Sequence, residues 1–567
     1  MQKNHFVLLS AAALLTLTSC SGKLGALSAD NFTVTPNPLE TQAGKVPATV
    51  NGTFPEKYMK KKAVVTVTPE LRYADGQVAK GQSATFQGEK VQGNAQTILY
   101  QVGGRYNIKS SFDYLDCNKA DMYLSFVARV GSKPVYIPAV KVANGIIATS
   151  ELYKNTLKSA QAAISPDAFQ RINAKKQEAA VKFLIQQAQL RQSELKNNSV
   201  QEFVKLLEQI NNDREGLKLN DVEVSAYASP DGGFELNDRL AAQRQQATQQ
   251  YVAQQLKKAN LSGTAVDAKY TAEDWDGFQE LVKASNIQDK DVILRVLSMY
   301  KDPEEREEQI RNMSEVFTDI KESILPELRR ARLIVNYEVI GRSDEVILLQ
   351  YNEDPSVLTV EELVYGANKL VKDDDTRRQW NETIARLYPS DYRALNNMAQ
   401  MAIANGQTSM AQNYLKSAAA INKNAAEVNT NLALLALKDG DVAAAETYLA
   451  KGSGSENFKE VMGNLNIAKG NYTQAASDLA GINSNSAALA QILAKDYTSA
   501  KSTLAAIKNP DATTSYLQAI LAARTGDAGN MATALANAIK LDPTLATRAA
   551  NDIEFVKYES TVKSLLK

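Results

Sequence analysis

The stretch that decides the fold of the C-terminal part reads AQMAIANGQTSMA over Ala399–Ala411, and a related stretch reads ALLALKDGDVAAA over Ala433–Ala445. In each copy a helix-breaking glycine, Gly406 or Gly440, separates two runs that are rich in small and apolar residues. The two glycines lie 34 residues apart. The next interval, from Gly440 to Gly470, is 30 residues. Recurrence at about this length predicts a helix-turn-helix unit that repeats along the chain.

The same pattern continues toward the C-terminus. Further turns fall at Gly470 and Gly526, and a shortened copy without the glycine surrounds Tyr497. Small residues stand before the glycines at Ala399, Ala433, Gly463 and Ala519, alanines follow at Ala411, Ala445 and Ala475, and leucines at Leu415, Leu449, Leu479 and Leu535. Because helices approach closely only where both side chains are small, we predict a stack of helices over residues 350–567, with a degenerate unit at 358–389.

These residues resemble the tetratricopeptide repeat (TPR) family, in which Pro389 and Pro543 occupy the positions that end a repeat. The resemblance implies a solenoid whose concave surface binds proteins or peptides. The alternative is a purely architectural stack that packs on the preceding domain. Since each repeat needs only its neighbours to bury its apolar face, we expect this region to fold by itself.

The N-terminus has the layout of a secretory signal: Lys3, an apolar run from Phe6 to Leu17, and then Leu17-Thr18-Ser19-Cys20. The tetrapeptide resembles the lipobox of bacterial lipoproteins. That resemblance implies removal of residues 1–19, lipidation of Cys20 and a tether over 20–30. Ser21 implies sorting to the outer membrane, where we expect the periplasmic face, with surface exposure as the alternative. An ordinary signal peptide with a chance cysteine is the other interpretation.

Composition excludes several classes of function. Lys plus Arg and Asp plus Glu each number 64, so no global charge attracts nucleic acid. The only histidine, His5, lies in the predicted signal, which excludes imidazole metal sites and histidine bases from the mature chain. If Cys20 is lipidated, Cys117 is the one thiol left, and we expect it to be a buried structural residue. We therefore expect no catalytic residue, metal or cofactor, although a carboxylate enzyme acting on wall polymers stays open.

The segment 31–150 alternates apolar and polar residues over short stretches such as Ala63–Val67 and Tyr123–Val127. Turn pairs such as Asn51-Gly52 and Asn144-Gly145 separate these stretches. This pattern predicts an antiparallel β-sandwich. Residues 151–179 follow as a polar and mostly helical connector that Pro166 interrupts.

The segment 180–345 alternates strands and helices. A helix at 200–210 leads to the strand Val222–Tyr227, a turn at 228–233 and a second helix, and strands recur at 265–270 and 333–339. Such alternation predicts a compact α/β layer with helices on one face of a sheet. The whole chain is thus expected to be a multidomain α+β protein.

The turn and the second helix carry Asn237, Leu240 and Arg244 in the pattern Asn-x-x-Leu-x-x-x-Arg. This resembles the OmpA-like C-terminal domain, which binds peptidoglycan. The resemblance implies that Arg244 pairs with a carboxylate of the stem peptide and that an aspartate in the turn takes the ammonium group. Ser229 stands at the family's aspartate position, and we expect Asp231 to substitute for it. Alternatively, Arg244 bridges to Glu235 or Asp238 on its own helix, and only the fold is retained.

Together these patterns predict a non-enzymatic envelope lipoprotein that acts as a scaffold or adaptor. Its partners would be the membrane through the lipid, proteins through the repeats, and peptidoglycan through Asp231, Asn237 and Arg244. A surface-exposed adhesin or immunoreactive antigen is the alternative.

Overall fold

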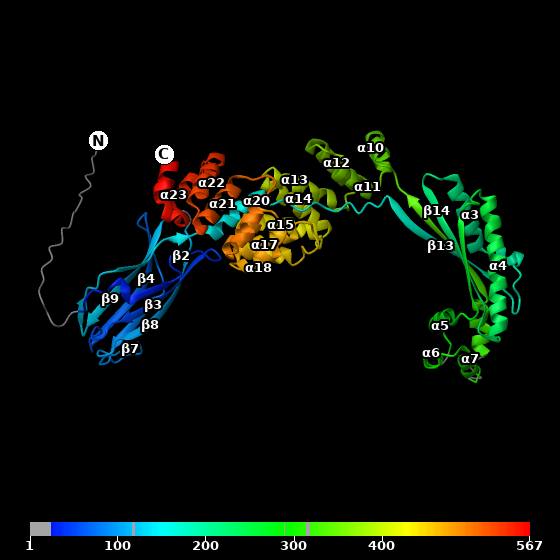
Figure 1. Ribbon diagram of the computed structural model, residues 1–567, viewed down its shortest axis with the longest axis horizontal. Coiled ribbons are helices and arrows are strands. Elements are labelled where there is room, and N and C mark those ends of the chain that lie inside the picture. The colour runs from blue at the N-terminus through cyan, green and yellow to red at the C-terminus, as the bar shows by residue number, and fades with distance from the viewer. Residues whose placement is uncertain (1–23, 116–118, 288–289, 313–317) are drawn as a thin grey trace. The chain divides into compact units, whose positions relative to one another are not determined.

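The computed structural model of the protein describes residues 24–567 except 116–118, 288–289 and 313–317 (Figure 1). Cys20, Cys117 and the predicted signal lie outside the described residues. The chain forms two compact units. One combines the residues up to Pro166 with Tyr388–Lys567, and the other is Asp167–Leu387. The second unit is therefore inserted into the first along the sequence.

The N-terminal β domain has two main sheets that share one core. The first has the order β1-β3-β8 (Phe32–Thr35, Lys45–Phe54, Gly104–Asp113). The second has the order β10-β9-β4-β6-β7 (Lys133–Val135, Ala120–Val130, Ala63–Tyr73, Ala84–Gly88, Gln96–Ile98), with β5 (Val78–Lys80) on β4 and β11 (Val140–Ala143) on β9. A short parallel pair joins β2 (Leu39–Glu40) to β12 (Ile146–Ile147). Alternate residues of the long strands are buried, such as Val46 and Val50 of β3 and Val65 and Val67 of β4, as the alternating pattern predicts.

The second unit is built on a four-stranded sheet of order β13-β16-β14-β15, in which β14 and β15 are parallel. Its strands are Ile172–Lys182, Arg330–Ile340, Leu217–Tyr227 and Ala265–Thr271 in that order. Helices α3 (Asn198–Asn212) and α4 (Phe234–Lys258) bury their apolar residues in one core with three of these strands. The predicted α/β layer is present. Its first strand begins at Ile172, before the boundary at 180 that the sequence pattern indicated.

A helical insertion separates β15 from β16. It comprises α5 (Trp275–Ala284), α6 (Lys290–Met299), α7 (Pro303–Arg311), η3 (Ile320–Ile324) and α9 (Leu325–Leu328), which surround a small core of their own. Helices α10 (Asp344–Glu353), α11 (Val360–Tyr365) and α12 (Asp374–Leu387) also belong to the second unit. The compact unit that contains the helix pairs resumes at Tyr388, so all but the end of the predicted degenerate repeat at 358–389 falls within the other unit.

Five helix pairs make up the C-terminal region (Figure 1). They are α13 (Arg393–Ala404) with α14 (Thr408–Ile421), α15 (Ala426–Lys438) with α16 (Val442–Leu449), α17 (Phe458–Ala468) with α18 (Tyr472–Asp478), α19 (Asn485–Leu493) with α20 (Tyr497–Ala506), and α21 (Ala512–Thr525) with α22 (Ala528–Leu541). The segments α23 (Leu545–Asn551), η6 (Ile553–Tyr558) and α24 (Glu559–Leu565) come after the last pair.

The turn residues lie where the sequence pattern placed them. Gly406, Gly440, Gly470 and Gly526 all have positive φ angles, of 71°, 80°, 79° and 80°. Lys495 takes the same left-handed conformation, with a φ of 65°, in the shortened copy that lacks glycine. The turn within each helix pair therefore contains one residue in the left-handed conformation. Glycine adopts this conformation at the least cost.

The small residues between the helices lie where the pattern placed them. Ala399, Ala433 and Ala519 are fully buried. At Gly463 even a methyl group is too large, because an added Cβ would lie 2.3 Å from the Cγ atom of Leu479. Within the described ranges, no helix has the length and apolarity needed to cross a membrane.

Candidate functional site

Part of the same chain covers one surface of the helix pairs, and we call the covered surface, which includes Asn397, Asn431 and Asn464, the groove. Residues 149–166, which we call the strap, begin at the C-terminal end of the helical region, where the Thr149 hydroxyl donates to Glu554. Farther along, Thr156 donates to Asn464 of α17 and the Ser165 N–H donates to Asn397 of α13. The strap thus runs along the helix pairs in the direction opposite to their order in the sequence.

The first half of the strap, residues 149–159, is held by large side chains. It consists of η2 (Thr149–Leu152) and α1 (Tyr153–Ser159), and α1 packs against α15, α17 and α19. The side chains of Leu152, Tyr153 and Leu157 belong to the core of the repeats. Complete burial of one leucine stabilises a fold by about 1.5–3 kcal/mol. The first half is therefore an integral part of the repeat core, and the predicted mostly helical connector is helical only here.

The second half, residues 160–166, has no regular structure and is held through its main chain. The Asn431 side chain accepts from the Ala163 N–H at 2.6 Å and donates to the Ala163 carbonyl at 2.8 Å. Asn396 donates to the same carbonyl at 3.1 Å, and Asn397 accepts from the Ser165 N–H at 2.8 Å. These three asparagines are at most 2% exposed. A buried amide that offers both a donor and an acceptor can recognise any peptide unit, whatever its side chain.

The fully buried side chains of the second half are small, and Ile164, which lies among them, is half-buried. Ala160, Ala162, Ala163 and Ser165 are all buried, whereas Gln161 and Pro166 are exposed. Asn457 donates to the Gln161 carbonyl at 2.8 Å, so the main chain is held on both sides of Ala162. The groove thus combines main-chain recognition with room for small residues only.

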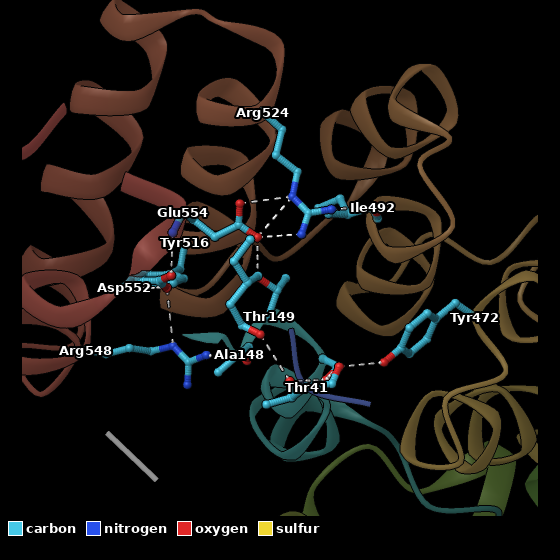
Figure 2. A network of polar contacts seen from close by, with 12 residues as sticks. Thr41, Ala148, Thr149, Tyr472, Ile492, Tyr516, Arg524, Arg548, Asp552 and Glu554 are labelled. Atoms are coloured by element: carbon cyan, nitrogen blue, oxygen red, sulfur yellow. Dashed lines mark hydrogen bonds and ion pairs between the residues drawn. The ribbon is translucent and has the colours of Figure 1, made fainter. Parts of the chain in front are cut away.

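A largely buried polar network joins the β domain to the repeats and to the segments after the last helix pair (Figure 2). Arg524 donates to both carboxylate oxygens of Glu554, with distances between 2.5 and 3.1 Å. Arg548 donates to the Ala148 carbonyl at 2.9 Å. The Tyr472 hydroxyl donates to the Thr41 carbonyl at 3.2 Å. These contacts fix where the strap enters the groove.

Two titratable groups at this junction are strongly perturbed. The Tyr516 hydroxyl donates to Asp552 at 2.7 Å (Figure 2). Burial raises the pKa of the Asp552 carboxyl, and nearby Arg548 opposes that shift. Burial also raises the pKa of Tyr516, and the charge of Asp552 adds to it. Buried polar groups of this kind must be fully paired, so the network favours one specific arrangement of the junction.

The central domain contains the residues of the predicted wall-binding site. Arg244 on α4 is 1% exposed and donates to three main-chain carbonyls: Tyr227 at 2.9 Å, Gln187 at 3.0 Å and Leu184 at 3.3 Å. Burial, together with the nearby charge of Arg329, lowers the pKa of Arg244 to about 10. Through these three hydrogen bonds, Arg244 joins the loop after β13 to the end of β14. They take the place of the alternative ion pair with Glu235 or Asp238 on the same helix.

Asp231 pairs with an arginine that the sequence pattern did not single out. Arg329 donates to Asp231 at 2.8 Å and to the Ser229 hydroxyl at 3.2 Å, and Ser229 itself donates to Asp231. Asn237 donates to the Gly232 carbonyl at 2.6 Å and so shapes the turn. The structure brings Asp231 and Ser229 together with Arg329, whereas the hydrogen bonds of Arg244 go to carbonyls.

The space beside this turn is narrow. A cavity of about 10 Å³ next to Asp231 is lined partly by Trp275, Phe278 and Glu307 of the insertion. That is about the volume needed for one water molecule. Nearby, Arg330 pairs with Asp274 and Arg332 pairs with Glu178. The doublet Arg329-Arg330, at the start of the last strand, was the available signal for Arg329.

Comparisons with known proteins add little to this geometry. No family model matches the chain, and no curated protein matches it. Among solved structures, a tetratricopeptide repeat protein from Parabacteroides merdae shows 14% identity and a TM-score of 0.27, over 46% of this chain and 96% of that one. The Cut9–Hcn1 hetero-tetramer of the APC/C shows 12% identity and a TM-score of 0.26, over 59% of this chain and 77% of that one. A likeness this weak establishes neither the fold nor the function, which we infer from the helix pairs themselves.

Proposed function

We propose that the protein is a non-enzymatic scaffold of the bacterial cell envelope whose helical repeats bind other proteins. The observation that carries this proposal is the hydrogen bonding between buried asparagines of the repeats and the main chain of residues 160–166. The groove already holds a polypeptide through contacts that do not depend on its side chains. Such contacts suit a surface that binds extended protein segments.

Protein binding is tested by crosslinking in intact cells, with the full-length chain carrying an affinity tag. We expect the same partner to be recovered repeatedly from envelope fractions of cells that contain the wild-type chain. A Cys20→Ser chain, which would lack the lipid anchor, should recover less of it. Crosslinks only within the chain itself, in both cases, would contradict a scaffold role.

We further propose that lipid at Cys20 holds the protein in the outer membrane, on the periplasmic face. The residues Leu17-Thr18-Ser19-Cys20 and Ser21 support this localisation. Cys20→Ser should abolish incorporation of labelled fatty acid and leave the precursor uncleaved, because the lipoprotein peptidase acts on the lipidated cysteine. A Cys20→Ser protein that still matures and remains in the outer-membrane fraction would contradict the anchor.

Peptidoglycan is proposed as a second partner, through the central domain. The pattern of Asn237, Leu240 and Arg244 supports it, together with the carboxylate of Asp231 in the turn. Since Arg244 and Asp231 already have partners in the chain, a stem peptide would have to exchange with those contacts.

A surface-exposed adhesin is the second candidate. One observation favours it: the β domain exposes large apolar side chains, among them Val102 and Val127 at 74% and Tyr136 at 84%. Exposed apolar side chains of this kind occur at protein interaction sites. Protease treatment of intact cells separates the two candidates, because only a surface protein would lose its β domain.

A further inference from the structure

We propose that residues 160–166 are an internal ligand that an extended segment of a partner protein replaces, while residues 149–159 stay in the groove. This inference rests on the proposed protein-binding function and deepens it by naming the surface and the chemistry of the partner. The partner segment would be extended and would carry small residues at the positions of Ala160, Ala162, Ala163 and Ser165.

The two halves of the strap differ in what holds them. Residues 149–159 insert Leu152, Tyr153 and Leu157 into the repeat core, and Thr156 donates to Asn464 at 3.0 Å. Residues 160–166 place only alanines and one serine at fully buried positions, and their one large apolar side chain, Ile164, is half-buried. Because buried apolar area sets most of the free energy of docking, the second half is the weaker one. Residues 160–166 can therefore leave the groove without disturbing the large side chains of residues 149–159.

The contacts of the second half are transferable to another polypeptide. Asn431, Asn396, Asn397 and Asn457 bind N–H and carbonyl groups of the strap, which every residue except proline offers. The side chains impose one requirement, because Ala163 and Ser165 are 0% exposed and leave no room for larger groups. An incoming extended segment with small residues would therefore satisfy the same asparagines.

The position of this half in the chain also permits its release. Asp167, the residue after Pro166, begins the second compact unit. Residues 160–166 can therefore detach from their C-terminal end while α1 remains packed on α15, α17 and α19. Such local opening needs less free energy than global unfolding.

Hydrogen exchange on the full chain tests the release directly. The Ala163 and Ser165 amides both donate to asparagines of the groove. We expect peptides covering residues 160–166 to exchange at least about tenfold faster than peptides covering α1, which measures an opening confined to the second half. Exchange of both halves at the same slow rate would overturn the proposal.

A binding experiment then tests the replacement. The probe is a fluorescent synthetic peptide with the sequence of residues 158–168, added to the full chain. In the variant Ala162→Glu/Ala163→Glu the internal ligand no longer fits, so we expect the probe to bind at least about tenfold more tightly than to the wild type. The control Gln161→Glu changes an exposed residue of the same segment and should leave binding at the wild-type level.

Adding Asn431→Leu to the double variant should abolish probe binding, because the amide that pairs with Ala163 is lost. A folded double variant that fails to bind the probe would overturn the proposal. A double variant that unfolds would also overturn it, since residues 160–166 would then be indispensable to the core. If the proposal fails while a partner is still crosslinked in cells, that partner binds elsewhere and the scaffold function stands.

Discussion

Asn431 binds both main-chain groups of Ala163, accepting from the N–H at 2.6 Å and donating to the carbonyl at 2.8 Å. The same amide nitrogen donates to Asn396 at 2.9 Å, and Asn396 donates to the Ala163 carbonyl. Ala163, Asn396 and Asn431 are all 0% exposed. Two asparagines from successive helix pairs therefore bind one peptide unit away from water, where unpaired polar groups are costly.

Replacing Asn431 with leucine should destabilise the folded protein. The Ala163 N–H would lose its acceptor, while its carbonyl would keep the bond from Asn396. One buried donor left without a partner costs about 1–3 kcal/mol. Urea unfolding measures the loss. Asn413→Leu, on an exposed position of α14, is the control and should change stability little. Equal effects of the two substitutions would contradict the role given to Asn431.

Gly463→Ala should also destabilise the folded protein, although helices usually prefer alanine to glycine. In an exposed helix this change stabilises by about 0.8–1.0 kcal/mol. Here the new Cβ would lie 2.3 Å from Leu479 Cγ, so the crossing of α17 and α18 would have to open. We expect a loss of about 1–3 kcal/mol, the range for overpacking. Thermal unfolding of the variant at an unchanged or higher Tm would show that the helices are not packed this closely.

The sequence predicted the features that depend on local patterns. The period set by Gly406 and Gly440, the shortened copy at Tyr497 and the alternating strands of the β domain all arise from residues close in the chain. The strap could not be predicted in this way. Ala163 and Asn431 are 268 positions apart, and a contact between a main-chain group and an asparagine leaves no periodic pattern in either segment.

The candidate wall-binding residues show the same limit. The pattern located the turn and the helix correctly, since Asp231 and Asn237 do shape one turn before α4. It did not predict that carbonyls of Leu184, Gln187 and Tyr227 take up the Arg244 guanidinium, because which loop covers a helix depends on tertiary packing.

Tyr106 predicts how stability falls at alkaline pH. Its ring lies among Phe54 and Phe86, and its buried hydroxyl has no hydrogen-bond partner in the described part of the chain. Burial raises the pKa of Tyr106 above its ordinary value of 10.0. Because the pKa of this hydroxyl is higher in the folded chain than in the unfolded chain, its contribution to folding stability is fully present below about pH 10. That contribution is lost as the pH rises above the unfolded pKa, because the unfolded chain then ionises first.

Tyr106→Phe should therefore flatten the loss of stability above about pH 10, where an unfolded tyrosine ionises. At neutral pH it should leave stability unchanged or raise it by up to about 1–3 kcal/mol, because an unpaired buried hydroxyl is removed. Urea unfolding at several pH values measures both effects. Tyr136→Phe, on a residue that is 84% exposed, is the control. An unchanged alkaline slope in Tyr106→Phe would contradict this account of the residue.

Peptidoglycan binding is measured by co-sedimentation of residues 167–387 with purified sacculi. This span keeps β13 whole, since that strand begins at Ile172. If Asp231 takes the ammonium of the stem peptide, Asp231→Asn should weaken binding by on the order of 2 kcal/mol, because a desolvated ligand charge loses its partner. Arg244→Ala should lower both binding and Tm, since its three carbonyl contacts are lost as well.

Glu235→Gln, on an exposed position of α4, is the control for the sedimentation assay and should bind like the wild type. A wild-type fragment that does not co-sediment would show that only the fold resembles the wall-binding family. Binding that survives Asp231→Asn would contradict the substitution of Asp231 for the aspartate missing at Ser229.

The most direct test of the account is to separate the groove from its ligand. A fragment of residues 388–567 lacks the strap, whose Leu152, Tyr153 and Leu157 are part of the repeat core, so we no longer expect it to fold stably by itself. Thermal unfolding followed by circular dichroism should show a low or poorly cooperative transition for the fragment alone. An equimolar synthetic peptide of residues 149–166 should raise the Tm, and the Asn431→Leu fragment should respond less. A fragment that melts cooperatively at the same temperature with and without the peptide would contradict the claim that these repeats bind polypeptide in their groove.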